Sequence, residues 1–180
     1  MSLQLHEVLK NGYSKHKKTN INGFKLDKDL SNGNNQVYFN KTSGKLIYNV
    51  NGTRNLKDWG VDFISAFGGL KSTNRYKDAD KKLQQAKKKY NTNAIITGHS
   101  LGGGISSLIS KKDDKVYTLN KYGLGNKIKE NEEGLRTSGD VVSLLNLNSK
   151  HMKTIKSNHS INPIKAHDVD NIKNQNINII

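Results

Sequence analysis

Apolar residues recur along the chain at two different spacings, and each spacing predicts a different kind of element. Two β-rich runs, Gln36–Asn40 and Lys45–Val50, flank a turn at Gly44 and predict a hairpin. In Asp78–Tyr90 the apolar residues return every three or four positions while lysines take the other face, which predicts a helix. The apolar residues that share this helical face are Ala79, Leu83, Ala86 and Tyr90.

The most informative stretch is Ala94–Ser110, where a short apolar run meets a serine between two glycines. The run Ala94–Ile96 predicts a buried strand, and the small and apolar residues after Gly102 predict a closely packed helix. Gly-x-Ser-x-Gly at such a junction is typical of a nucleophile elbow, because residues without a Cβ let the turn be tight. The pattern therefore makes Ser100 the candidate nucleophile.

The remaining segments complete an alternation of strands and helices. Lys115–Leu119 predicts the next strand, and Leu135–Ser138 predicts a further one. Residues 1–35 are polar and are expected to be irregular apart from a short helix over Leu3–Leu9. Strand–helix alternation favours a three-layer α/β domain over residues 1–180, with a mostly parallel sheet flanked by helices and no large cap domain.

Charge and cysteine content narrow the function classes. The formal net charge is +15 and the sequence pI is about 9.8, which favours attraction to nucleic acid or an anionic lipid surface. A solubilising charge coat is the alternative interpretation. The absence of cysteine excludes disulfides, zinc–thiolate sites and cysteine nucleophiles. Residues 1–20 have no apolar signal core and no run approaches transmembrane length, so we expect an intracellular protein.

The acid of a serine hydrolase is expected between the nucleophile and the base in the order of the chain. Asp140 fits, because it follows a predicted strand and a glycine. Asp113 and Asp114 lie in a charged turn and are expected at the surface. Asp168 and Asp170 come too late to precede the base. We therefore predict that Asp140 orients the base.

Three histidines follow the predicted acid and are candidates for the base. His167 is preferred because apolar neighbours in Pro163–Val169 can anchor its loop, while His159 and His151 remain alternatives. His99 precedes the acid and is interpreted as a structural residue of the elbow.

Two backbone donors are expected for the oxyanion hole. One is the N–H of Leu101, directly after the nucleophile, and the other comes from the loop after an earlier strand. Gly52-Thr53 ends such a strand, although an ordinary strand-exit turn would have the same sequence.

Four motifs resemble those of the class 3 lipases, the fungal-lipase-like branch of the α/β-hydrolases. Val50–Phe63 (VNGTRNLKDWGVDF) is similar to their oxyanion segment, and Ile95–Gly103 (IITGHSLGG) is similar to their elbow. Gly139–Val142 and Ala166–Ile172 are similar to their acid and histidine motifs. The chain departs from the family at Asn51, where an Arg is usual.

The resemblance implies a compact α/β-hydrolase that cleaves lipid esters with Ser100, Asp140 and His167, with Thr53 as second oxyanion donor. It also implies that the segment Arg54–Phe67 can form a lid. No metal or cofactor is implied. The aromatic residues expected to contact substrate are Trp59, Phe63 and Phe67. Small members of this kind resemble proteins of bacteria, protists and large DNA viruses, so a virion-associated enzyme is the alternative location.

Three other functions compete with lipid hydrolysis. A catalytically silent hydrolase fold would serve as a structural or virion-interaction protein. A basic nucleic-acid-binding domain is less favoured, because no recognised motif is present and the aromatic residues are not interleaved with the basic runs. A water-soluble carboxylesterase would differ only in substrate. We predict action on phospholipid or acylglycerol esters at an anionic surface.

Overall fold

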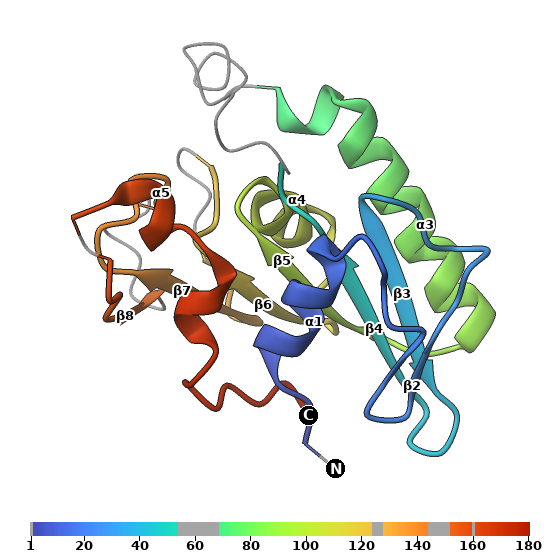
Figure 1. The fold of residues 1–180 in the computed structure, drawn as a ribbon. Helices are drawn as coiled ribbons and strands as arrows, with labels where there is room; N and C mark the ends of the chain where they lie inside the picture. Colours follow the sequence, from blue (N-terminus) through green and yellow to red (C-terminus); the bar gives the residue numbers. More distant parts are fainter. Residues whose placement is uncertain (1, 54–68, 124–127, 144–151, 160) are drawn as a thin grey trace.

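The computed structural model describes residues 2–53, 69–123, 128–143, 152–159 and 161–180, which form a sheet flanked by helices (Figure 1). Neighbouring strands in the sheet follow the order of the chain. The strands are β1 (Asn20–Ile21), β2 (Phe24–Leu26), β3 (Asn35–Asn40), β4 (Lys45–Val50), β5 (Ala94–His99), β6 (Lys115–Leu119), β7 (Glu132–Thr137) and β8 (Met152–Ile155).

The sheet changes from antiparallel to parallel at β4. β1 to β4 form an antiparallel meander, whereas β4 to β8 are parallel. In the parallel part, Val50 of β4 pairs with Gly98 of β5, and Gly98 pairs with Thr118 of β6. The carboxyl ends of these strands therefore meet at one edge, where ligands of open α/β sheets bind. This confirms the predicted mostly parallel sheet.

Helices cover both faces of the sheet (Figure 1). The parallel crossovers place α3 (Asn74–Tyr90) and α4 (Leu101–Ile109) against one face, where they bury alternate residues of β4 such as Leu46 and Tyr48. On the other face, α1 (Leu5–Tyr13) and the 3-10 helix η5 (Val169–Ile172) pack together over Ile47. Successive side chains of β4 thus point to opposite faces of the sheet and pack in two separate hydrophobic cores.

The predicted helices and strands are found, with shifted bounds. The short N-terminal helix starts and ends later than expected, at Leu5 and Tyr13, and α3 begins at Asn74 because Thr73 caps it through its side chain. β7 begins at Glu132 rather than Leu135. Its first residues are charged, so the apolar pattern did not include them.

Two expectations about polar residues were wrong. The segment 1–35 is not irregular, since besides α1 it adds β1 and β2 to the sheet and buries Ile21 and Phe24. Asp114 is not a surface residue. It is buried at 1 % exposure, where it accepts a hydrogen bond from the Ala94 amide and pairs with Lys87. A carboxylate can occupy the interior when it is paired and hydrogen-bonded in this way.

Candidate active site

Ser100 occupies a sharp turn between β5 and α4. Its backbone has φ 56° and ψ −127°, a conformation that residues with a Cβ rarely adopt. The Ser100 amide donates to the carbonyl of Leu119 at the end of β6, and its own carbonyl accepts from the amides of Gly104 and Tyr122. The turn is therefore fixed at the carboxyl edge of the sheet on both sides of the serine.

The elbow glycines are required by close backbone approach. A Cβ on Gly98 would lie 2.5 Å from the carbonyl oxygen of Gly102, and one on Gly102 would lie 2.1 Å from that of Val50. Either contact would force the backbone apart, because neither atom is at the end of a flexible side chain. The Gly-x-Ser-x-Gly pattern is thus explained by packing between β5, α4 and the end of β4.

The Ser100 hydroxyl is fully buried, and its Oγ has no hydrogen-bond partner among the described residues. Such a group is unusual, since most buried polar atoms are bonded. An exception of this kind, held on a strained backbone, is typical of a functional position.

Asp140 and His167 lie together as a buried pair, each about 1 % exposed. Asp140 follows β7 through a turn in which Gly139 has φ 84°, and its amide donates to Thr137. His167 directly follows the short helix α5 (Pro163–Ala166). The Nδ1 of His167 lies 2.6 Å from Oδ1 of Asp140. The carboxylate can only accept, so Nδ1 carries the proton in this bond.

The second oxygen of Asp140 is also satisfied, because Oδ2 accepts from the Ser143 amide at 2.9 Å. Burial by itself would raise the pKa of Asp140. The hydrogen bond and charge of His167 and the bonds from Ser143 outweigh it, and the pKa lies below its ordinary value. The carboxylate is therefore ionised at neutral pH and can stabilise a positive charge on His167.

His99 connects this pair to the elbow. Its Nε2 lies 2.8 Å from the carbonyl oxygen of His167, and the two imidazole rings are 4.5 Å apart. Asn120, which follows β6, also donates to that carbonyl oxygen at 3.2 Å. His167 is thereby attached to the ends of β5 and β6, the two strands that hold Ser100. Burial, with a contribution from His167, lowers the pKa of His99 to about 3, so His99 is neutral.

The exit of β4 packs directly on the serine. A Cβ on Gly52 would lie 3.0 Å from the Cβ of Ser100. The Gly52 amide donates to the Tyr13 hydroxyl, and Nη2 of Arg75 donates to the carbonyl of Asn51. Asn51 is buried and donates through its side chain to the carbonyls of Gly12 and Gly33. An Asn at this position therefore connects the strand exit to α1.

The structure brings some predicted residues together and leaves others apart. Leu101 is the first residue of α4, directly after Ser100. His159 lies in a polar pocket with Lys156, Lys165 and Asp168, and the acid bonds to His167 rather than to it. The predicted lid Arg54–Phe67, with Trp59, Phe63 and Phe67, lies outside the described residues, as does His151.

Three residues that contact the site from different segments were not predicted from the sequence: Tyr13, Asn120 and Arg75. No local signal could have identified them, since Tyr13 is 86 residues away from the histidine that it contacts. Within the described residues, no group of three or more acidic, His or Cys side chains could hold a metal ion. No helix in this part of the chain is both long and apolar enough to cross a membrane.

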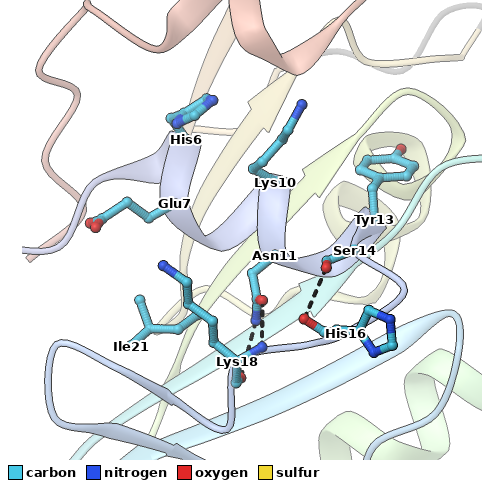
Figure 2. Close-up of a pocket in the computed structure, with 9 residues that line it drawn as sticks. All are labelled: His6, Glu7, Lys10, Asn11, Tyr13, Ser14, His16, Lys18 and Ile21. Carbon is cyan, nitrogen blue, oxygen red and sulfur yellow. Dashed lines mark hydrogen bonds between the residues drawn. The ribbon is translucent and has the colours of Figure 1, made fainter.

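A pocket of about 450 Å³ opens along α1 and is lined by His6, Lys10, Asn11, Tyr13 and Lys18, among others (Figure 2). Ser100, Asp140 and His167 do not line it. Two of its basic groups, His6 and Lys10, are paired with Asp170. This pocket is therefore bordered by Tyr13, which also contacts the exit of β4, and Asp170 offsets part of the positive charge along it.

A mostly parallel sheet with flanking helices and a strained serine between strand and helix defines an α/β-hydrolase fold. The family model described as the Tle-like phospholipase domain, within the phospholipase-like group, matches residues 6–174. The chain therefore belongs to the family of Tle-like phospholipase domains.

Solved structures of fungal lipases have a similar fold. Lip2 lipase from Yarrowia lipolytica is 15 % identical with a TM-score of 0.58, over 84 % of this chain and 76 % of that one. The N225Q form of MDLA from Penicillium cyclopium is 14 % identical with a TM-score of 0.57, over 84 % and 77 % of the two chains. The resemblance to fungal-type lipases is thus confirmed at the level of fold. The search of functionally curated proteins found no match.

Proposed function

We propose that this protein hydrolyses carboxylic ester bonds of lipids, with Ser100 as nucleophile, His167 as general base and Asp140 as the group that orients the base. One observation carries the proposal. The buried hydrogen-bonded pair of Asp140 and His167 is attached to the same strand ends that hold a buried, strained serine. Membership of a phospholipase-like family supports lipid ester hydrolysis in general.

The proposed reaction has two stages. In the first, Oγ of Ser100 attacks the ester carbonyl while Nε2 of His167 takes the hydroxyl proton. The tetrahedral intermediate carries an oxyanion that accepts hydrogen bonds from Leu101 N–H and Thr53. Its collapse releases the alcohol, which receives the proton from His167. In the second stage, water attacks the acyl-enzyme by the same route and releases the fatty acid.

Tyr13 limits which donor the strand exit can offer to the oxyanion. The Gly52 amide is already bonded to the Tyr13 hydroxyl at 2.8 Å. The proposed second donor is therefore Thr53, one residue further along. We expect Thr53→Pro, which removes the N–H, to lower kcat more than Thr53→Ala, which keeps it.

The physiological substrate is proposed to be an ester lipid at an anionic surface, either phospholipid or acylglycerol. The formal net charge of +15 favours adsorption to such a surface. Adsorption to vesicles of anionic phospholipid is expected to weaken as salt rises from about 0.01 to 1 M, because screening shortens the reach of surface charges. Cosedimentation measures it, with neutral phosphatidylcholine vesicles as control, and binding indifferent to salt would contradict the role of charge.

A chain-length series of nitrophenyl esters tests the reaction. Ser100→Ala and His167→Ala are each expected to abolish turnover, whereas His159→Ala keeps it and serves as the matched histidine control. Loss of activity in His159→Ala but not in His167→Ala would refute the assignment of the base. Turnover that survives Ser100→Ala, or is absent from the wild type, would instead favour a catalytically silent hydrolase fold.

A further inference from the structure

The last residue of α1 is joined to both sides of the candidate site by a chain of hydrogen bonds. The Tyr13 hydroxyl lies 2.8 Å from the Gly52 amide nitrogen and 2.8 Å from Nδ1 of His99. The other ring nitrogen of His99 lies 2.8 Å from the carbonyl oxygen of His167. Figure 2 shows Tyr13 at the end of α1, turned away from Lys18 and Ile21.

The direction of every bond in this chain can be deduced. The carbonyl oxygen of His167 can only accept, so Nε2 of His99 carries a proton. His99 is neutral because it is buried, so its Nδ1 carries a lone pair. The Tyr13 hydroxyl must then donate to Nδ1, and its oxygen accepts the proton of the Gly52 amide.

We propose that Tyr13 is a positioning residue, whose hydroxyl holds His99 in the Nε2–H tautomer and thereby holds the backbone of His167 and the exit of β4 around Ser100. This inference rests on the proposed hydrolase function. Tyr13 acts through its two neighbours and not on the substrate. Its action requires only that one hydroxyl donates to an imidazole and accepts from an amide.

The opposite tautomer of His99 would break this arrangement. With a proton on Nδ1, the lone pair of Nε2 would face the lone pairs of the His167 carbonyl oxygen, and the bond that attaches His167 to β5 would be lost. The tyrosine hydroxyl prevents this, because as a donor to Nδ1 it favours a lone pair there. The ring also packs edge-on against His99, with centroids 5.6 Å apart.

The effect of the Tyr13 hydroxyl can be tested separately from the packing of α1 against the sheet. Asn51 already ties the strand exit to the carbonyl of Gly12, so the backbone connection does not need the Tyr13 hydroxyl. A matched control contacts the same helix from β3. Tyr38 is also buried and its hydroxyl accepts from Asn11 of α1, at 2.6 Å, without contacting His99. Tyr38→Phe therefore removes a buried hydroxyl that bonds to the same helix, at a residue that is not part of the candidate site.

The test compares Tyr13→Phe with Tyr38→Phe in the full chain, using a short soluble nitrophenyl ester. We expect Tyr13→Phe to lower kcat about 10- to 100-fold with KM changed less than about 2-fold, because small displacements of catalytic groups cost up to about 10²-fold. Tyr38→Phe is expected to keep the wild-type kcat. The ¹⁵N shifts of His99, assigned by their loss in His99→Leu, are expected to show Nε2–H in the wild type and a tautomer mixture in Tyr13→Phe.

If Tyr13→Phe does not fold, a second pair of variants tests the bond from His99 to the His167 carbonyl. His99→Gln keeps an amide that can donate to the His167 carbonyl, whereas His99→Leu does not, so we expect kcat to be at least about 10-fold higher in the Gln variant. Equal kcat in these two variants, or a wild-type kcat and tautomer in Tyr13→Phe, would overturn the inference. Turnover that survives Ser100→Ala would refute the hydrolase proposal instead.

Discussion

Two clusters of buried charge lie along the parallel strands, and they differ in how their members are surrounded. One is Asp140 with His167, at the carboxyl edge of the sheet beside the elbow. The other is Lys121 with Glu132, 3.0 Å apart and with both side chains fully buried. In the second cluster, Glu132 also accepts from the hydroxyls of Ser107 and Thr118, so α4, β6 and β7 are tied together.

This difference indicates different roles. The carboxylate of Glu132 accepts hydrogen bonds from α4 and β6, and its partner Lys121 also donates to Ser107 of α4, so this cluster joins neighbouring elements. Asp140 instead bonds to Nδ1 of an imidazole, whose other nitrogen is the one proposed to take the proton of Ser100. We therefore expect changes at Asp140 to affect turnover and changes at Glu132 to affect stability.

The largest effect is expected from Asp140→Asn. The amide keeps the shape of the side chain but removes the charge and favours the wrong tautomer of His167, so on the proposed mechanism kcat is expected to fall by about 10⁴-fold, the loss that this change causes in the serine-protease triad. Burst and steady-state kinetics with nitrophenyl esters measure it. Asp113→Asn, at an exposed acid, serves as the control and is expected to leave kcat unchanged.

Glu132→Gln is expected to destabilise the fold instead. The change removes the negative charge of the buried pair that Glu132 forms with Lys121, and breaking a buried pair from one side typically costs about 3–5 kcal/mol of unfolding free energy. Burial already lowers the pKa of Lys121 against the opposing effect of Glu132, so the variant lysine would tend to lose its proton. Urea unfolding measures the loss, while kcat per folded molecule is expected to stay within about 3-fold of the wild type.

The double variant Lys121→Met/Glu132→Leu checks this interpretation. Because the double variant removes both charges, we expect it to lose less unfolding free energy than Lys121→Met and Glu132→Leu lose in sum. Strict additivity would show that the pair contributes nothing beyond its two separate side chains. A fall in kcat that follows Glu132→Gln without loss of stability would reverse the roles assigned to the two clusters.

A smaller effect is expected on the unfolding free energy at acidic pH, where Asp140 takes up a proton. Because the pKa of Asp140 lies below its ordinary value of 3.8, its ionised form contributes stability that is fully present above that value. This contribution is lost as the pH falls from 3.8 through the folded-state pKa. We expect the unfolding free energy of Asp140→Asn to depend less on pH over this window than that of the wild type. Equal slopes in urea titrations would contradict the depressed pKa.

The candidate catalytic residues could be predicted from the sequence, whereas the residues that pack around them could not. The elbow around Ser100 and the turn at Asp140 have local signatures, because glycines and strand ends are visible in a few consecutive residues. The pairing of Asp140 with His167 agrees with the predicted order of acid and base. Their catalytic roles stay predictions until the variants are measured.

The surrounding residues and strands could not be predicted, because their positions depend on contacts between distant segments of the chain. Lys121, Glu132 and Asp114 are charged, and sequence patterns assign such residues to the surface unless a partner is known. β1 and β2 contain two and three residues, too few to show an alternation. Tyr13 acquires its partners only when α1 packs against the end of β5.

The backbone angles of Ser100 have a consequence for the stability of the fold. A residue with a Cβ at φ 56° and ψ −127° costs about 1–3 kcal/mol, and glycine alone relieves it. Ser100→Gly should therefore unfold at higher urea than Ser100→Ala. The hydroxyl at this position therefore comes at a cost in stability, and a strained residue of this kind is typical of a functional position rather than of a packing position.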